Sequence, residues 1–295
     1  DPGLSYYVLQ EGTAELCVTL SSACESFAGG TFIATPGGVC DGGESGDDSL
    51  VPENSSLQEQ ALTAMLSSDS VGVSPECLEL ECMQAMKDAG EYITFSPRQT
   101  VSEVGVVFYP GGGLDARAYA AATHAFAAEG FTSFLIPMPG DLAFNAIDIA
   151  LDVIENNPSI SKWVIVGHSL GGVASAKFAL RNPGVLDGIA LWATYLDTGD
   201  DLSALDLSAA SIFGELDALA TMEEVLADQA KMPAGTDYVN IRGGNHSYFM
   251  WAGLRDGDAE STLISQHQQT VLAADSTLNL LRRVELGETL ERDQG

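Results

Sequence analysis

The sequence WVIVGHSLGG, residues 163–172, joins a short apolar run to a segment rich in small residues that continues to Asn182. The apolar run predicts a buried strand, and the small-residue segment predicts a helix. A G-x-S-x-G pattern between a strand and a helix is typical of a sharp turn that presents the serine hydroxyl. A Cβ at Gly167 or Gly171 would meet the neighbouring strand or helix. We predict that Ser169 is a nucleophile; the alternative is a glycine-rich turn with a solvated serine.

A serine nucleophile needs a histidine that removes its proton. The chain has four histidines. His124 and His267 fall on expected helices, where an ordinary structural role is favoured, and His168 is expected to point away from the serine. His246 differs because it follows the β-rich run Tyr238 to Ile241 on a loop with two glycines. We predict that His246 is the base; the alternative is a histidine in an ordinary turn.

An acidic residue must orient this histidine. The run Ser208 to Phe213 predicts a buried strand, and the turn GELD at 214–217 follows it, so Asp217 is the predicted acid. The alternatives are Asp197, Asp200 and Asp201, which follow the preceding strand and are otherwise solvated loop charges. The chain order of serine, aspartate and histidine is that of α/β-hydrolase triads and differs from those of chymotrypsin and subtilisin.

Two backbone amides are expected to bind the oxyanion that forms when the serine attacks. One belongs to Leu170, which follows the nucleophile at a helix N-terminus, where amides are free and the helix dipole favours negative charge. The other is expected in the loop PGGG at 110–113, after the strand predicted at 104–109. Gly112 is the first candidate and Gly113 the second. A phosphate-binding loop is disfavoured because neither G-x-G-x-x-G nor G-K-[ST] follows.

Six ordered blocks of the sequence resemble a bacterial family often labelled "alpha/beta hydrolase fold-5", whose members are mostly assigned as carboxylesterases. The resemblance covers about Leu57 to Leu281. It implies that Ser169, Asp217 and His246 form a catalytic triad and that Gly112 and Leu170 form the oxyanion hole. The blocks are FYPGG at 108–112, DARAY at 115–119, IPMP at 136–139, GHSLGG at 167–172, GELD and LAT at 214–217 and 219–221, and GGNH at 243–246.

The alternation of strand and helix patterns along the chain predicts an α/β fold. In the α/β-hydrolase form of this fold, helices flank a mostly parallel central sheet. We expect residues 1–56 to form a small, acidic, cysteine-containing N-terminal extension and residues 57–295 to form the catalytic domain. The expected strands are 92–95, 104–109, 132–136, 163–166, 188–192, 208–213 and 238–241, and the expected helices are 59–66, 116–129, 144–155, 170–182, 222–231 and 262–283.

The composition is strongly acidic, with 42 Asp and Glu against 12 Lys and Arg and a formal net charge of -30. Such a surface repels phosphates, so nucleic acid and anionic membranes are disfavoured as partners. No apolar run reaches the roughly 18 residues that span a bilayer, which predicts no integral membrane association. The acidity is typical either of adaptation to high salt, where screening relieves repulsion, or simply of a soluble secreted protein.

All five cysteines precede residue 104, which favours disulfide bonds in an oxidising compartment. Two disulfides are expected, with Cys17–Cys24 and Cys77–Cys82 as the simplest pairing. Zinc binding lacks the required spacing, and the acidic run 40–48 is favoured as a solvated loop over a calcium site. We interpret the beginning Asp1-Pro2-Gly3 as that of a processed secretory form, and predict a secreted or periplasmic protein.

Together these patterns predict a serine carboxylesterase that hydrolyses short-chain esters and needs no cofactor or metal. The short connection 193–207 leaves no room for a large lid, and the candidate pocket residues are Gly113, Phe144, Tyr248 and Trp251. A lipase or thioesterase of the same fold remains an alternative, because the triad does not choose the leaving group. A non-catalytic binding protein on this scaffold is the alternative from another class. The oligomeric state and natural ester stay open.

Overall fold

The computed structural model describes residues 4–6 and 57–287. The strands are β1 (Leu4–Tyr6), β2 (Val71–Ser74), β3 (Ile93–Pro97), β4 (Val104–Tyr109), β5 (Ser133–Leu135), β6 (Lys162–His168), β7 (Gly188–Trp192), β8 (Ser208–Gly214) and β9 (Asp237–Ile241). The helices are α1 (Glu59–Thr63), α2 (Leu80–Ala89), α3 (Ala120–Ala128), α4 (Ile149–Asn156), α5 (Leu170–Arg181), α6 (Met222–Ala227) and α7 (Gln266–Leu286). Short 3₁₀ turns are η2 (Ala116–Tyr119), η3 (Pro139–Asp141), η4 (Ala143–Ala146), η5 (Gln229–Lys231) and η6 (Ser247–Phe249).

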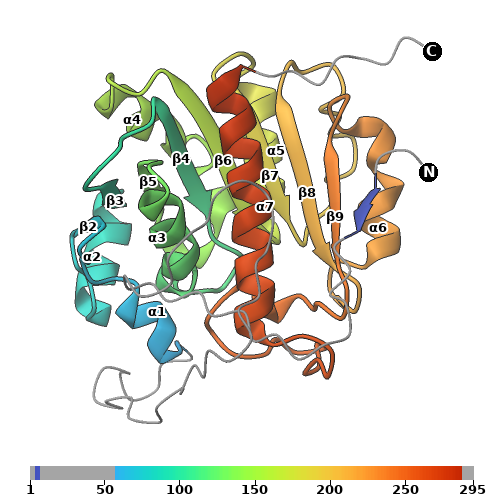
Figure 1. Cartoon of the computed structure of the whole chain (residues 1–295), viewed down its shortest axis with the longest axis horizontal. Coiled ribbons are helices and arrows are strands. Elements are labelled where there is room, and N and C mark those ends of the chain that lie inside the picture. The colour runs from blue at the N-terminus through green and yellow to red at the C-terminus, as the bar shows by residue number, and fades with distance from the viewer. Residues whose placement is uncertain (1–3, 7–56, 288–295) are drawn as a thin grey trace, which may run out of the picture.

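All nine strands belong to one sheet, in the order β1-β9-β8-β7-β6-β4-β5-β3-β2 (Figure 1). The pairings from β5 through β4, β6, β7, β8 and β9 to β1 are parallel, whereas β3 pairs antiparallel with β5 and with β2. The carboxyl ends of the parallel strands therefore meet at one edge of the sheet. This mostly parallel sheet confirms the predicted α/β-hydrolase fold.

Two apolar cores cover the two faces of the sheet, because successive side chains of a strand point to opposite faces. Val106 and Phe108 of β4 join the core beneath α3 and α7, whereas Val107 and Tyr109 join the core beneath α4 and α5. Figure 1 shows α7 crossing in front of the sheet and α5 behind it. Since both faces are covered, the central strands are apolar throughout, and these are the strands that the sequence predicts best.

Several elements differ from the sequence prediction. The helix expected at 144–155 is interrupted after η4, since the Tyr109 hydroxyl from β4 donates to the Ile147 carbonyl at 2.6 Å and accepts from the Ala150 amide at 3.1 Å. The helix expected at 116–129 starts as the 3₁₀ turn η2. Neither β2 nor α2 was expected. Strand β1 lies within the expected extension and pairs with β9 of the catalytic sheet.

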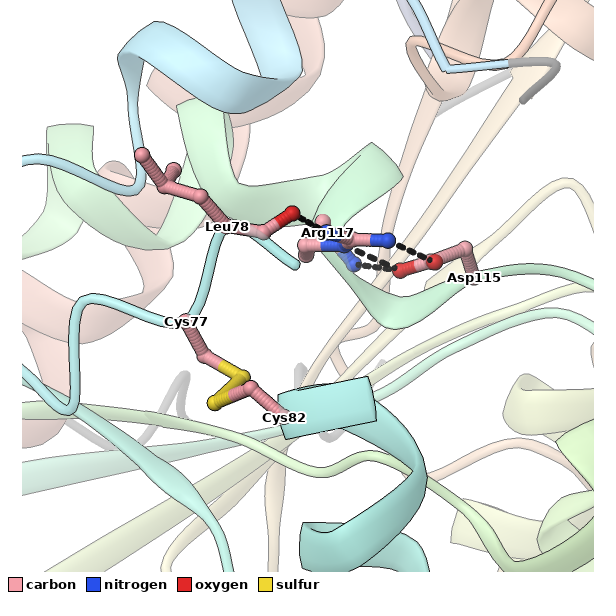
Figure 2. The surroundings of a disulfide bond; sticks show 5 residues. All are labelled: Cys77, Leu78, Cys82, Asp115 and Arg117. Atoms are coloured by element: carbon pink, nitrogen blue, oxygen red, sulfur yellow. Dashed lines mark hydrogen bonds and ion pairs between the residues drawn. A yellow bond between two sulfur atoms is a disulfide. The ribbon is translucent and has the colours of Figure 1, made fainter. Parts of the chain in front are cut away.

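The segment β2 to α2, with Asp115 and Arg117 beside it, forms what we call the disulfide corner. Cys77 and Cys82 are bonded there, which confirms this predicted pair; Cys17, Cys24 and Cys40 lie outside the described residues. Arg117 is fully buried and binds both carboxylate oxygens of Asp115, and its Nη1 donates to the carbonyl of Leu78, between the two cysteines (Figure 2). A buried cation is thus paired inside the corner.

Among the residues that the structure describes, no helix has both the length and the apolar composition needed to cross a membrane.

Candidate active site

Ser169 occupies a strained turn between β6 and α5. Its backbone has φ 52° and ψ −125°, in a region that non-glycine residues rarely adopt. The turn is compact: a Cβ on Gly171 would lie 2.2 Å from the Tyr109 carbonyl oxygen, and one on Gly167 would lie 2.5 Å from the Gly171 carbonyl oxygen. The serine amide donates to the Trp192 carbonyl of β7 at 3.0 Å. These contacts hold a half-buried serine at the carboxyl edge of the sheet.

The loops after β8 and β9 are tied together, and this brings Asp217 to His246. The Leu216 amide donates to the Gly244 carbonyl at 2.7 Å, and a Cβ on Gly214 would lie 2.5 Å from the carbonyl carbon of Gly244. From α7, the buried Gln269 side chain accepts from the Asn245 amide and donates to the Asn245 carbonyl. The loop that carries His246 is therefore fixed from both sides.

His246 Nδ1 and Asp217 Oδ2 are 2.9 Å apart, and both side chains are almost fully buried. The other carboxylate oxygen, Oδ1, accepts from the amides of Leu219 and Ala220 at 2.8 and 2.7 Å. All its contacts suit an ionised carboxylate that accepts a hydrogen bond from Nδ1–H of His246 and leaves His246 Nε2 as the basic nitrogen.

The alternative acids occupy a different part of the structure. Asp197 and Asp200 both form ion pairs with Lys177 on α5, at 2.8 and 2.9 Å. The hydrogen bond from Lys177 lowers the pKa of Asp197 below its usual value. The Asp201 carboxylate accepts from the Ser203 amide. Of the four candidate carboxylates, only Asp217 is bonded to His246 within the described residues.

The two predicted oxyanion-hole residues pack against each other. A Cβ on Gly112 would lie 2.5 Å from Leu170 Cδ1, so the glycine loop packs directly on the first residue of α5. The amides of Gly111 and Gly113 are engaged by the Tyr119 hydroxyl and the Asp141 carbonyl, at 3.1 and 2.7 Å. Within the described residues the amides of Gly112 and Leu170 donate to no acceptor. They are therefore available to a ligand oxygen.

A buried pair, Tyr119 and His168, underlies this region. The Tyr119 hydroxyl lies 2.7 Å from His168 Nδ1 while it accepts from Gly111, and the His168 ring centroid lies 4.6 Å from that of His246. Burial, and then the neighbouring His246, lower the pKa of His168 well below its usual value, so this ring stays neutral. Its Nε2 is buried without a hydrogen-bond partner in the described part of the chain.

The predicted pocket residues do not form one cluster. Gly113 is exposed beside Gly112, and Phe144 in η4 packs at the margin of the core beneath α4. The hydroxyl of Tyr248 accepts from the Ser261 amide. Trp251 is bonded through its backbone to Ala118 and Gln58, and it lines a cavity of about 300 Å³ between α1, α3 and α7. A role for these four residues in the acyl pocket stays a prediction.

The sequence did not indicate the roles of three residues near the site. Tyr119 and His168 form a buried pair, and Arg255 carries a charge. Tyr119 lies in the DARAY block at 115–119. Only the fold shows that its hydroxyl reaches back to the amide of Gly111 in the glycine loop. No group of three or more His, Cys, Asp or Glu that could hold a metal occurs in residues 4–6 and 57–287.

Comparison with known proteins agrees with this fold. The sequence profile of the alpha/beta hydrolase family matches residues 105–271, more than half of the chain. Among solved structures, a thermophilic esterase from Thermogutta terrifontis, determined with malate bound, is similar with a TM-score of 0.50 and 14% identity. That match covers 66% of this chain and 94% of the esterase, and it supports the fold. None of the curated proteins matches the sequence.

Proposed function

Because the chain belongs to the alpha/beta hydrolase family, we propose that it is a serine carboxylesterase that cleaves short-chain carboxylic esters through an acyl-enzyme. The observation that carries the proposal is the hydrogen-bonded pair Asp217–His246 at the edge of the sheet where Ser169 ends its strand in a strained turn. A turn with a purely structural role would not require a strained backbone at Ser169 beside the Gly112 and Leu170 amides, which have no acceptor among the described residues. Such strain is concentrated at functional sites.

In this proposal Ser169 Oγ attacks the ester carbonyl carbon while His246 Nε2 accepts the hydroxyl proton. Asp217 holds the imidazole through Nδ1 and stabilises its positive charge. The amides of Gly112 and Leu170 bind the negative charge on the former carbonyl oxygen. His246 then gives its proton to the departing alcohol, and water, activated by the same histidine, releases the acid from Ser169. The chemistry uses only groups of the protein and water.

The preference for short acyl chains is supported by the connection between β7 and β8. Residues 193–207 contain no helix, so this position, which often carries a lid in related folds, offers little apolar cover. A site without a broad apolar surface suits small esters in water better than a lipid interface. We further infer an extracytoplasmic location, which the Cys77–Cys82 disulfide supports.

The direct test is labelling with a fluorophosphonate probe, which reacts with activated serines. The wild-type protein should be labelled, and Ser169→Ala should not. Ser276→Ala is the matched control, since the hydroxyl of this buried serine on α7 bonds only the Leu272 carbonyl among the described residues, and its loss should leave labelling intact. A series of p-nitrophenyl esters should give the highest kcat/KM at about two to six acyl carbons. A protein that is not labelled and cleaves no ester would be a binding protein, and a maximum at about twelve carbons or more would indicate a lipase.

A further inference from the structure

Arg255 lies on the loop that follows His246 and is fixed by that loop. Its amide donates to the Ser247 hydroxyl at 2.8 Å, and its carbonyl accepts from the Asp258 amide at 3.0 Å. Asp258 in turn accepts from the Ser247 amide through Oδ2 at 2.7 Å. Because Ser247 is the next residue after His246, the backbone of Arg255 keeps a fixed position relative to the predicted base.

The guanidinium of Arg255 reaches across to the glycine loop. Its Nη2 lies 3.9 Å from the position that a Cβ on Gly113 would occupy. Gly113 is exposed and adjoins Gly112, which packs on Leu170, the first residue of α5. The charge also affects the groups beneath the loop: burial and the neighbouring His246, and more weakly Arg255, lower the pKa of His168. A positive charge therefore stands beside the predicted oxyanion hole.

Among the residues that the structure describes, this cation has no anionic partner. Within the described residues Arg255 forms no ion pair and no side-chain hydrogen bond, although the chain carries 42 acidic residues. Two carboxylates beside the glycine loop are engaged elsewhere, Asp141 with Lys87 at 2.5 Å and Asp115 with Arg117 at 2.7 Å. A half-buried guanidinium with five donors and no acceptor is suited to bind an anion that arrives from outside.

On the basis of the proposed function, we propose that Arg255 binds a carboxylate of the ester substrate, so that the enzyme prefers esters carrying a negative charge near the scissile carbonyl. An arginine can hold a carboxylate through two parallel hydrogen bonds, which fixes orientation as well as adding affinity. In a protein of formal net charge -30, a single cation beside the reacting carbonyl also offsets the general repulsion of an anionic substrate.

The test compares charged and neutral versions of one ester. On the acyl side the pair is mono-4-nitrophenyl succinate and its methyl ester; on the alcohol side it is 3-acetoxybenzoate and its methyl ester. The ratio of kcat/KM for the charged over the neutral ester should be higher in the wild type than in Arg255→Gln by roughly 5- to 30-fold, in one of the two pairs. This factor is the one expected for loss of a charge-assisted hydrogen bond. The responsive pair identifies the side of the ester that carries the charge.

Two further variants separate binding from a structural effect. Arg255→Lys keeps the charge without the two-pronged geometry and should retain part of the preference. Arg98→Gln makes the same change of net charge on an exposed arginine after β3, at the opposite end of the sheet, and should leave the ratio at the wild-type value. For the wild type, about 1 M NaCl should reduce the ratio, because the Debye length is then about 3 Å and the attraction between Arg255 and the substrate carboxylate is screened.

The inference is wrong if Arg255→Gln lowers kcat/KM for the charged and neutral esters by the same factor, which would indicate a structural role. It is also wrong if the wild type cleaves neutral esters but the ratio of kcat/KM for the charged over the neutral ester is the same in the wild type and in Arg255→Gln. This result would leave the proposed esterase function intact. Absence of fluorophosphonate labelling together with absence of all ester hydrolysis would instead overturn the proposed function, and the inference with it.

Discussion

The carboxyl edge of the parallel strands holds an unpaired buried polar atom and a strained turn, whereas in the disulfide corner the buried charge is fully paired. His168 Nε2 is buried without a partner and Ser169 has a strained backbone. By contrast, Arg117 and Asp115 leave no buried polar side-chain atom unpartnered within the described residues. Unpaired buried groups lower stability, and fully paired ones rigidify a structure. We therefore expect substitutions at the edge to affect activity most, and substitutions in the corner to affect stability most.

The largest expected effect tests the acid at the edge. Asp217→Asn should lower kcat by about 10⁴-fold, because an amide cannot stabilise the imidazolium and favours the wrong tautomer of His246. Asp197→Asn is the matched control, an exposed carboxylate that pairs with Lys177 at 2.8 Å, and should change kcat by less than about twofold. Steady-state kinetics on a neutral ester measures both. The opposite outcome would transfer the acid role to Asp197.

In the corner, Arg117→Met should lower the free energy of unfolding by about 3–5 kcal/mol, since the Asp115 carboxylate and the Leu78 carbonyl lose a buried partner. Arg181→Met removes an ion pair of similar length, 3.1 Å to Asp148, in which both side chains are about half exposed, and should cost under about 1 kcal/mol. Urea titration measures both values. If folded Arg117→Met instead showed a tenfold lower kcat, the disulfide corner would be needed for activity as well as for stability, because it would then hold the glycine loop in place.

The fold could largely be predicted because the central strands are buried on both faces. Strands β4 and β7 have the predicted bounds, since a parallel strand covered by helices is a continuous apolar run. Strand β1 has three residues and owes its place to pairing with β9, far along the chain, which no local pattern encodes. The break before α4 likewise depends on Tyr109, whose hydroxyl donates a hydrogen bond to the Ile147 carbonyl.

The candidate site was predictable to the extent that its residues lie directly after strands. Asp217 and His246 each follow a recognisable strand, so topology alone places both at one edge of the sheet. The pocket could not be assigned in this way. Trp251 is close to His246 in sequence, but its backbone bonds to Ala118 and Gln58 hold it beside α1 and α3. The charge of Arg255 becomes informative only once its neighbours in space are known to have other partners.

A half-buried carboxylate that belongs to neither region gives a third case for the comparison. Burial raises the pKa of Asp275 on α7 to about 6, and its Oδ2 lacks a partner in the described part of the protein. Since the folded pKa exceeds the usual 3.8, the protonated form favours folding below about pH 4, and this contribution is lost as the pH rises through 6.

Asp275→Asn should accordingly raise the free energy of unfolding at pH 8 by about 1–3 kcal/mol, and by much less at pH 4. Thermal unfolding at the two pH values measures this difference, and kcat at pH 8 should stay within about twofold of the wild type. An equal change in stability at both pH values would show that ionisation of Asp275 is not the cause.

The smallest expected effect comes from two buried tyrosines that differ only in what their hydroxyls bind. Burial raises the pKa of both Tyr109 and Tyr119, so each hydroxyl is neutral and can donate and accept. Tyr119→Phe leaves the Gly111 amide and His168 Nδ1 without their partner, which should loosen the glycine loop and the His168 ring that lies beside His246. We expect kcat to fall about tenfold, or about 1.4 kcal/mol, with KM changed less than twofold.

Tyr109→Phe removes another buried hydroxyl, on β4, with one bond to the Ile147 carbonyl and one to the Ala150 amide. Both variants should lower the free energy of unfolding by about 1–3 kcal/mol, because each leaves a buried amide or carbonyl unpaired. Only Tyr119→Phe should lower kcat, since the partners of Tyr109 are Ala150 in α4 and Ile147, two residues before that helix. If the two variants lost equal activity at equal loss of stability, the Tyr119–His168 pair would be a structural contact of the core, and the distinction between edge and corner would then rest on Asp217 and His246 alone.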